Sequence, residues 1–196
     1  MPVTAQCWIC DGVLYSLRAL RVSTSWGRSS VTGRTEARDH MKTETFIRRS
    51  RIGASAEDVY AWHALPGALE TLTPPGEQAK LLEKTGGLES GARVVIQFGR
   101  WPFRRRWIAE HGDFQEGRHF SDVQVSGPFA YWKHTHTFEP DGRDSCVLED
   151  RVEYALPFGA LGRCVAGWYV RRKIERLFEY RHGVTLSAFA HGNHRD

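Results

Sequence analysis

The chain has 196 residues, of which 41 % are hydrophobic and 26 % charged, so it can form one packed domain, alone or with an appendage, and shows little sign of wholesale disorder. No stretch approaches the roughly 20 apolar residues that span a bilayer, which excludes an integral membrane protein. Four cysteines in this length do not form a disulfide scaffold. We therefore expect a soluble, cytoplasmic domain.

The net charge of +4 raises the question of a nucleic-acid partner. Residues 1–40 carry five Arg against three acidic residues, and residues 41–196 carry 22 basic against 20 acidic residues. The folded part is thus nearly balanced. We interpret the basic runs 48–49, 104–106 and 171–173 as solvated faces and expect no nucleic-acid partner.

The first forty residues differ from the rest in composition. The segment Ser23–Thr35 is rich in Ser, Thr, Gly and Arg and has no apolar period. Met41 stands directly before the first strand-like run, which makes it a candidate for the true start of translation. We expect 1–40 to be a poorly ordered extension, 41–190 to be the folded domain and 191–196 to be a disordered tail.

The domain is predicted to begin with a strand and two short helices. Residues 45–52 have strand character, and Ser55 followed by Asp58 provides a helix N-cap with an acidic residue three positions later. That helix runs through Trp62. A second short helix begins at Pro66 and ends before the Thr73-Pro74-Pro75 run.

Six further strands and one long helix are predicted after these helices. The strand candidates are separated by Gly, Pro and Asp-Gly signals at spacings too short for crossover helices, so the sheet must be antiparallel. They are residues 79–83, 93–98, 105–115, 119–125, 130–139 and 145–154. A helix over about 164–189 is expected to bury the face formed by Val170, Ile174, Leu177, Phe178, Arg181, Val184 and Ala188.

One face of the 130–139 strand combines aromatic and histidine side chains. Because side chains alternate along a strand, Trp132, His134, His136 and Phe138 share that face. A turn at 140–143 would place His134 opposite Asp150 and Trp132 opposite Val152, with Cys146, Leu148 and Tyr154 on the same side. His134 beside Asp150 is a candidate polar anchor inside a ligand pocket, and the alternative is a core histidine that only fixes strand geometry.

The orientation of Asp122 and Gln124 stays open. A two-residue turn at Gly127-Pro128 would pair Asp122 with Lys133 and place both on the surface. The opposite orientation would direct both residues inward.

The order of elements and one long motif resemble a known superfamily. The motif runs from Gly117 to Phe138 and reads G-x-x-F-x-D-x-Q-x-x-G-P-F-x-x-W-x-H-x-H-x-F. Over residues 43–189 the chain resembles the START-like (SRPBCC, polyketide cyclase/dehydrase-like, Bet v 1-like) superfamily. Within it the motif is similar to a bacterial subfamily often labelled cell division inhibitor, which occurs alone or fused to epimerase-like proteins.

The resemblance implies an α+β helix-grip fold, in which a curved antiparallel sheet of about seven strands wraps a long C-terminal helix and encloses a cavity. It also implies that Asp122 and Gln124 point inward, which would need a bulge near Gly127. Together with the aromatic residues of the strands it predicts the ligand-binding set Trp62, Phe98, Trp107, Asp122, Gln124, Trp132, His134, His136, Asp150, Tyr154, Phe178 and Arg181.

The expected function is binding of a hydrophobic small molecule or lipid-like ligand that carries a polar group. Two alternatives remain open. His134 and Asp150 could perform acid–base chemistry in a cyclase or dehydratase, or the domain could bind an epimerase-like partner protein. The Trp101–Phe103 segment is a candidate hairpin tip for transient membrane contact.

No cofactor or metal is expected from the local sequence. Cys7 and Cys10 form half of a zinc or redox signature, but no second pair follows. His134 and His136 have ligand-like spacing and could mimic a two-histidine, one-carboxylate site with Asp150, although no third strong ligand stands nearby in the sequence. A phosphate-binding glycine loop and a G-x-S-x-G nucleophile elbow are both absent from the sequence.

Overall fold

The computed structural model describes residues 42–77, 79–99, 102 and 104–190. The predictions for the 1–40 extension, the start at Met41, the 191–196 tail and the contact at Trp101 and Phe103 lie outside the described residues.

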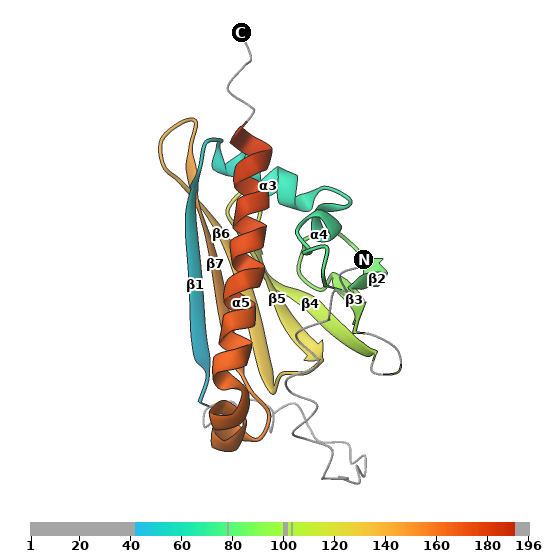
Figure 1. The fold of residues 1–196 in the computed structure, drawn as a ribbon. Coiled ribbons are helices and arrows are strands. Elements are labelled where there is room, and N and C mark those ends of the chain that lie inside the picture. Colours follow the sequence, from blue (N-terminus) through green and yellow to red (C-terminus); the bar gives the residue numbers. More distant parts are fainter. Residues whose placement is uncertain (1–41, 78, 100–101, 103, 191–196) are drawn as a thin grey trace, which may run out of the picture.

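The main layer is a curved, seven-stranded antiparallel sheet (Figure 1). Its strand order is β1-β7-β6-β5-β4-β3-β2, so the first two strands of the chain form the two edges. This confirms the predicted helix-grip sheet, and the predicted strand bounds agree closely with those observed. The strands are β1 (Glu44–Ile52), β2 (Lys80–Thr85), β3 (Arg93–Phe98), β4 (Arg105–Gln115), β5 (His119–Ser126), β6 (Tyr131–Pro140) and β7 (Cys146–Ala155).

Three described helices lie on the inner side of the sheet (Figure 1). Helix α3 (Ala56–Ala64) begins as predicted, because the Ser55 side chain accepts a hydrogen bond from the backbone N–H of Asp58 at 3.1 Å. Helix α4 (Ala68–Thr71) follows it. Helix α5 (Gly159–Ala190) crosses the face of β1, β7 and β6, and it begins five residues before the predicted start at residue 164.

The core consists of two apolar clusters on the inner face of the sheet. The first joins α5 to β1, β6 and β7 through Phe46, Trp132, Val152, Tyr154, Leu156, Ala166, Val170, Ile174 and Phe178. The second joins α3 to the other end of these strands and to β5 through Ile52, Ala56, Val59, Tyr60, Phe120, Phe138, Cys146 and Leu148.

The buried face of α5 differs from the predicted one in its C-terminal half. After Phe178 the buried positions are His182 and Thr185, whereas Ala188 is exposed and Val184 is only half-buried. A line of contacts that advances four residues at a time turns by about 40° per step around a helix. The buried line of α5 therefore drifts around the helix as it follows the twisted sheet.

Two other side chains of α5 lie in unusual environments. Trp168, a large aromatic side chain, is 78 % exposed. Lys173, expected on a solvated face, is buried, with its Nζ 5.9 Å from the centre of the Tyr169 ring. The long stem of a lysine can be buried against helix neighbours, which a count of charges does not reveal.

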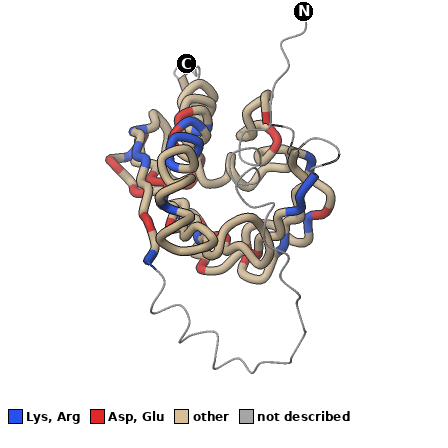
Figure 2. Tube along the Cα trace, turned by 60° about the horizontal axis from the view of Figure 1, so that its bottom comes forward, with Lys and Arg blue, Asp and Glu red and all other residues tan. Residues whose placement is uncertain are grey.

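Basic and acidic residues are interspersed along the described chain (Figure 2). The exposed Arg49 pairs with Glu149, and Arg171 pairs with Glu175 at 3.3 Å. Such local pairs account for two of the basic runs without a continuous positive track. Within the described residues, no helix is long and apolar enough to cross a membrane.

Candidate functional site

A layer of polar side chains separates the two apolar clusters on the inner face of the sheet. Along β6, His134 and His136 lie between Trp132 of one cluster and Phe138 of the other. Along β7, Asp150 lies between the apolar residues of the same two clusters. The alternation that buries the apolar side chains therefore also buries these three polar ones.

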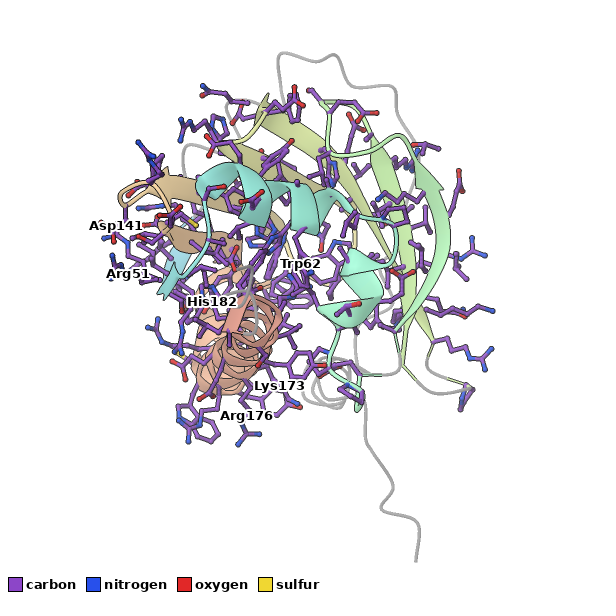
Figure 3. All side chains as sticks on the ribbon, turned by 90° about the horizontal axis from the view of Figure 1, so that it is seen from above. Arg51, Trp62, Asp141, Lys173, Arg176 and His182 are labelled. Atoms are coloured by element: carbon purple, nitrogen blue, oxygen red, sulfur yellow. The ribbon has the colours of Figure 1, made fainter. Side chains whose placement is uncertain are left out.

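Asp150 is the centre of this layer and faces three imidazoles. Its Oδ1 lies 3.1 Å from His134 Nε2 and 2.6 Å from His136 Nδ1, and its Oδ2 lies 2.9 Å from Nε2 of His182. All four side chains are at most 8 % exposed. His182 lies on the side of α5 that faces the sheet (Figure 3), so the network ties the helix to β6 and β7.

The network continues on both sides of Asp150. His182 Nδ1 lies 2.8 Å from Ser50 Oγ on β1, and His134 Nδ1 lies 3.2 Å from Asp122 Oδ1 on β5. Carboxylates only accept hydrogen bonds, so His134 must donate from both ring nitrogens. Four strands and α5 are thereby linked through one chain of hydrogen bonds.

The charges of the network follow from burial and pairing. Burial alone would lower the pKa of His134, but its hydrogen bonds to Asp122 and Asp150 outweigh that effect and raise it. Burial and the neighbouring charge of His134 lower the pKa of His136 to about 3. Although burial favours a protonated carboxyl, the surrounding imidazoles hold the pKa of Asp150 well below its usual value. The arrangement is an imidazolium between two carboxylates, with a neutral imidazole beside it.

The observed register of β6 and β7 differs from the predicted one by two residues. His134 lies opposite Val152, and His136 lies opposite Asp150. The connection is longer than the predicted turn, because its hydrogen bond runs from Asp141 N–H to the carbonyl of Ser145. A shift of two residues keeps every side chain on its face, so His134 still reaches Asp150 diagonally.

The orientation left open for Asp122 is inward. Asp122 lies opposite His134 and Val123 lies opposite Lys133, a shift of one residue from the pairing of a two-residue turn. The β5–β6 pairing reaches this register without the bulge that the resemblance required. Gln124 stabilises the loop between β5 and β6, because its side-chain amide donates a hydrogen bond to the carbonyl of Phe129 at 2.8 Å.

The remaining predicted residues occupy three places. Phe98, Trp107 and Trp132 form an aromatic wall, with the rings of Trp107 and Trp132 5.0 Å apart. Tyr154 is fully buried and donates to Glu44 at 2.9 Å. The predicted residues on the helices have other partners. Trp62 packs against Phe189, and Phe178 packs edge-on against His134. Arg181 donates to the carbonyl of Leu72 and lies over the Phe178 ring.

Four residues of this region were not predicted as site residues. His182 follows Phe178 by four positions and Ile174 by eight, so helical spacing could have identified it. His63 packs on Phe138 with ring centres 5.1 Å apart, while Ser50 and His111 reach the site from the neighbouring strands. No local motif indicates Ser50 or His111, since their proximity depends on strand order.

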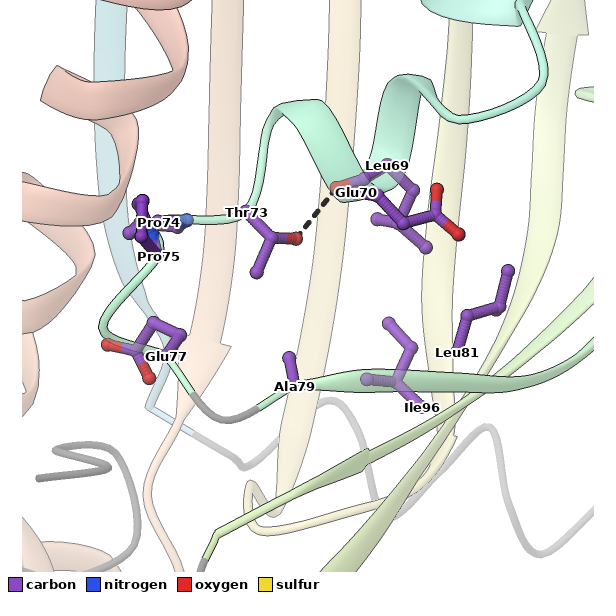
Figure 4. Close-up of a pocket in the computed structure, with 9 residues that line it drawn as sticks. All are labelled: Leu69, Glu70, Thr73, Pro74, Pro75, Glu77, Ala79, Leu81 and Ile96. Carbon is purple, nitrogen blue, oxygen red and sulfur yellow. Dashed lines mark hydrogen bonds between the residues drawn. The ribbon is translucent and has the colours of Figure 1, made fainter. Parts of the chain in front are cut away.

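One pocket of the described residues is lined by none of the network residues. A volume of about 200 Å³ is bounded by α4, the following loop, and β2 and β3 (Figure 4). None of the twelve predicted site residues lines it. Thr73 closes one side through a hydrogen bond to the carbonyl of Leu69, and Pro74 and Pro75 lie on the side toward α5. The lining consists of Leu69, Glu70, Thr73, Pro74, Pro75, Glu77, Ala79, Leu81 and Ile96.

The fold is shared with solved structures of low sequence identity. Norcoclaurine synthase from Thalictrum flavum aligns with a TM-score of 0.60 at 17 % identity, over 88 % of this chain and 99 % of that chain. A START superfamily protein from Mycobacterium smegmatis aligns with a TM-score of 0.53 at 14 % identity, over 74 % and 97 % of the two chains. A nucleoside-diphosphate sugar epimerase from Corynebacterium glutamicum aligns with a TM-score of 0.55 at 24 % identity, over 72 % of this chain but 28 % of that chain.

The sequence itself matches one family model. No curated protein matches it significantly. The family described as polyketide cyclase / dehydrase and lipid transport matches residues 52–178, which include every strand from β2 to β7 and α5 as far as Phe178. The chain therefore belongs to the polyketide cyclase / dehydrase and lipid transport family.

Proposed function

We propose that this chain binds a small hydrophobic molecule that carries a hydrogen-bond donor or a positive charge, held between the sheet and its helices. The observation that supports this function is the composition of the pocket below α4. Leu69, Leu81 and Ile96 supply an apolar surface, whereas Glu70 and Glu77 supply two carboxylates. Apolar walls with a few polar groups are typical of ligand sites.

The volume limits the size of the ligand. About 200 Å³ lies below the range of roughly 300–1,000 Å³ that is typical of sites for drug-sized ligands. The pocket therefore suits a compact ligand or the end of a longer apolar chain. Carboxylates in the lining disfavour an anionic head group, since like charges repel at short range.

Acid–base catalysis by His134 is less compatible with the geometry. Both of its ring nitrogens face carboxylates, and its side chain is 3 % exposed. A general base needs a nitrogen within hydrogen-bond reach of the substrate proton. The enzyme hypothesis would require Asp122 or Asp150 to release His134 when a substrate binds.

The ligand proposal is tested by filling the pocket. Leu81 lines the pocket, while the adjacent Leu82 is 41 % exposed. We expect Leu81→Trp to weaken the binding of Nile red, followed by fluorescence, at least tenfold, and Leu82→Trp to leave it nearly unchanged. Equal effects of the two substitutions would contradict the proposal.

The charge of the ligand is tested with two compounds that have the same alkyl tail and different head groups. Competition between dodecylamine and dodecanoic acid for the Nile red site should favour the amine. Glu70→Gln should reduce that preference, because it removes one carboxylate from the lining. Native mass spectrometry of the purified protein would then show whether a bound molecule accompanies it. Tighter binding of the acid would contradict the assigned ligand class.

A further inference from the structure

We propose that Asp122, His134 and His136 form a binding site for a divalent transition-metal ion such as Zn²⁺. Each offers one ligand atom, and these atoms lie within 4.8 Å of one another on the inner face of β5 and β6. The sequence pattern suggested Asp150 as the carboxylate of such a site. The structure instead points to Asp122.

The separation of the first two donors fits a shared ion. Asp122 Oδ1 and His134 Nδ1 lie 3.2 Å apart. Two ligand atoms bound at about 2.0–2.1 Å to a tetrahedral zinc ion are separated by about 3.3 Å. An ion could therefore take the place of the proton between them with little movement of either side chain.

Asp150 holds the His134 ring from the side opposite the proposed ion. It accepts a hydrogen bond from His134 Nε2 at 3.1 Å, and His182 holds its other oxygen at 2.9 Å. A histidine that binds a metal through one nitrogen commonly donates from the other nitrogen to a carboxylate. This contact fixes the His134 ring so that Nδ1 faces Asp122.

His136 supplies an independent sign that a ligand belongs here. It is 6 % exposed, and its Nδ1 contacts Asp150 Oδ1 at 2.6 Å without meeting hydrogen-bond geometry. An ion bound by His136 would give this buried imidazole a well-directed partner, which a buried polar group requires.

The surroundings suit a site with an open coordination position. Phe120 stacks on His136 with ring centres 4.2 Å apart, and Phe178 contacts His134 edge-on. The Asp122 side chain remains 20 % exposed, which leaves one side accessible. Closing the three donors onto one ion requires movements of up to about 1.5 Å, which side-chain rotation allows. Two imidazoles and one carboxylate suit zinc or ferrous iron better than magnesium or calcium.

The test measures zinc binding to the full chain by titration calorimetry. Cys7 and Cys10 are replaced by Ser, and His191 and His194 by Gln, so that these residues cannot bind zinc independently. We expect one Zn²⁺ per chain, and at least tenfold weaker binding after Asp122→Asn or His136→Gln. His119→Gln, on β5 but outside the cluster, is the matched control and should bind like the reference chain.

Several outcomes would overturn the site. They are the absence of zinc binding at about 1 mM, or an affinity unchanged by both substitutions. Circular dichroism establishes whether each variant is folded. If the variants unfold, Co²⁺ added to the reference chain decides: an intense tetrahedral visible spectrum supports the site, and a weak spectrum like that of aqueous Co²⁺ rejects it. No organic ligand is present, so the result is independent of the Nile red experiments.

Discussion

His134 and Asp150 are in contact although they are not opposite each other in the sheet. The strand register places Val152 opposite His134, yet His134 Nε2 lies 3.1 Å from Asp150 Oδ1. The contact is diagonal, and it leaves the position opposite Asp150 to His136. One carboxylate can therefore face two imidazoles of β6 and, through its second oxygen, His182 of α5.

The first prediction concerns this shared carboxylate. Asp150→Asn places an amide that can donate where the His134 and His182 imidazoles need an acceptor, and it leaves His134 without one of its two carboxylates. We expect a loss of about 3–5 kcal/mol in the free energy of unfolding, as for other broken buried ion pairs. Asp141→Asn is the control, because its salt bridge with Arg51 is exposed and contributes at most about 1 kcal/mol. Similar losses in urea titrations would show that the network is not important for stability.

The second prediction concerns the packing of α5 against the sheet. Phe178 is fully buried in the apolar cluster between α5 and the sheet, so Phe178→Ala should cost about 3–5 kcal/mol of stability. Trp168, on the same helix, is 78 % exposed, and its replacement by Ala should cost at most about 0.5 kcal/mol. Denaturant titration measures both values. A larger loss for Trp168→Ala would mean that this face of α5 is covered in solution.

The third prediction concerns the hydrogen bond between Tyr154 and Glu44. The Tyr154 hydroxyl is buried and donates to Glu44 at 2.9 Å, which joins β7 to the edge strand β1. Tyr154→Phe keeps the ring and removes this bond to a charged group. We expect a loss of about 1–2 kcal/mol by urea titration. No loss would indicate that water replaces the hydroxyl as partner of Glu44.

The fourth prediction concerns acid sensitivity. Burial lowers the pKa of His63 below its usual value of about 6.5, and the nearby Arg181 and His182 lower it further. The hydrogen bond to the carbonyl of Val59 and the charge of Asp150 act in the opposite direction but are weaker. As the pH falls below about 6.5, the unfolded chain binds this proton before the folded protein does, and stability decreases by up to about 1.4 kcal/mol per pH unit. The pKa of His136 is lowered as well, so it adds to the decrease, whereas His134 has a raised pKa and acts with the opposite sign above that pH.

His63→Phe separates the contribution of His63 from the others. It keeps an aromatic ring beside Phe138 and removes the titrating group. Between pH 6.5 and 5 the stability of this variant should depend less on pH than that of the parent chain, as measured by urea titrations at each pH. Parallel curves for the two proteins would contradict the assignment.

The sequence by itself determined the order of elements and the face of each central strand. Alternation predicted that Trp132, His134, His136 and Phe138 share the inner face, and they are all buried there. The Ser55 cap predicted where α3 begins. These features depend on residues that are close in the chain, because helix capping and strand alternation are local.

Only the tertiary structure decided which polar side chains meet. The inward orientation of Asp122 depends on a register shift of one residue, which reverses the face of a strand. His182 reaches Asp150, and Ser50 reaches His182, from elements more than 30 residues away in the chain, so no local pattern pairs them. Strand order and the drift of the buried line around α5 bring them together. These depend on packing over the whole sheet, since the free energy of burying its inner face is shared among all of its elements.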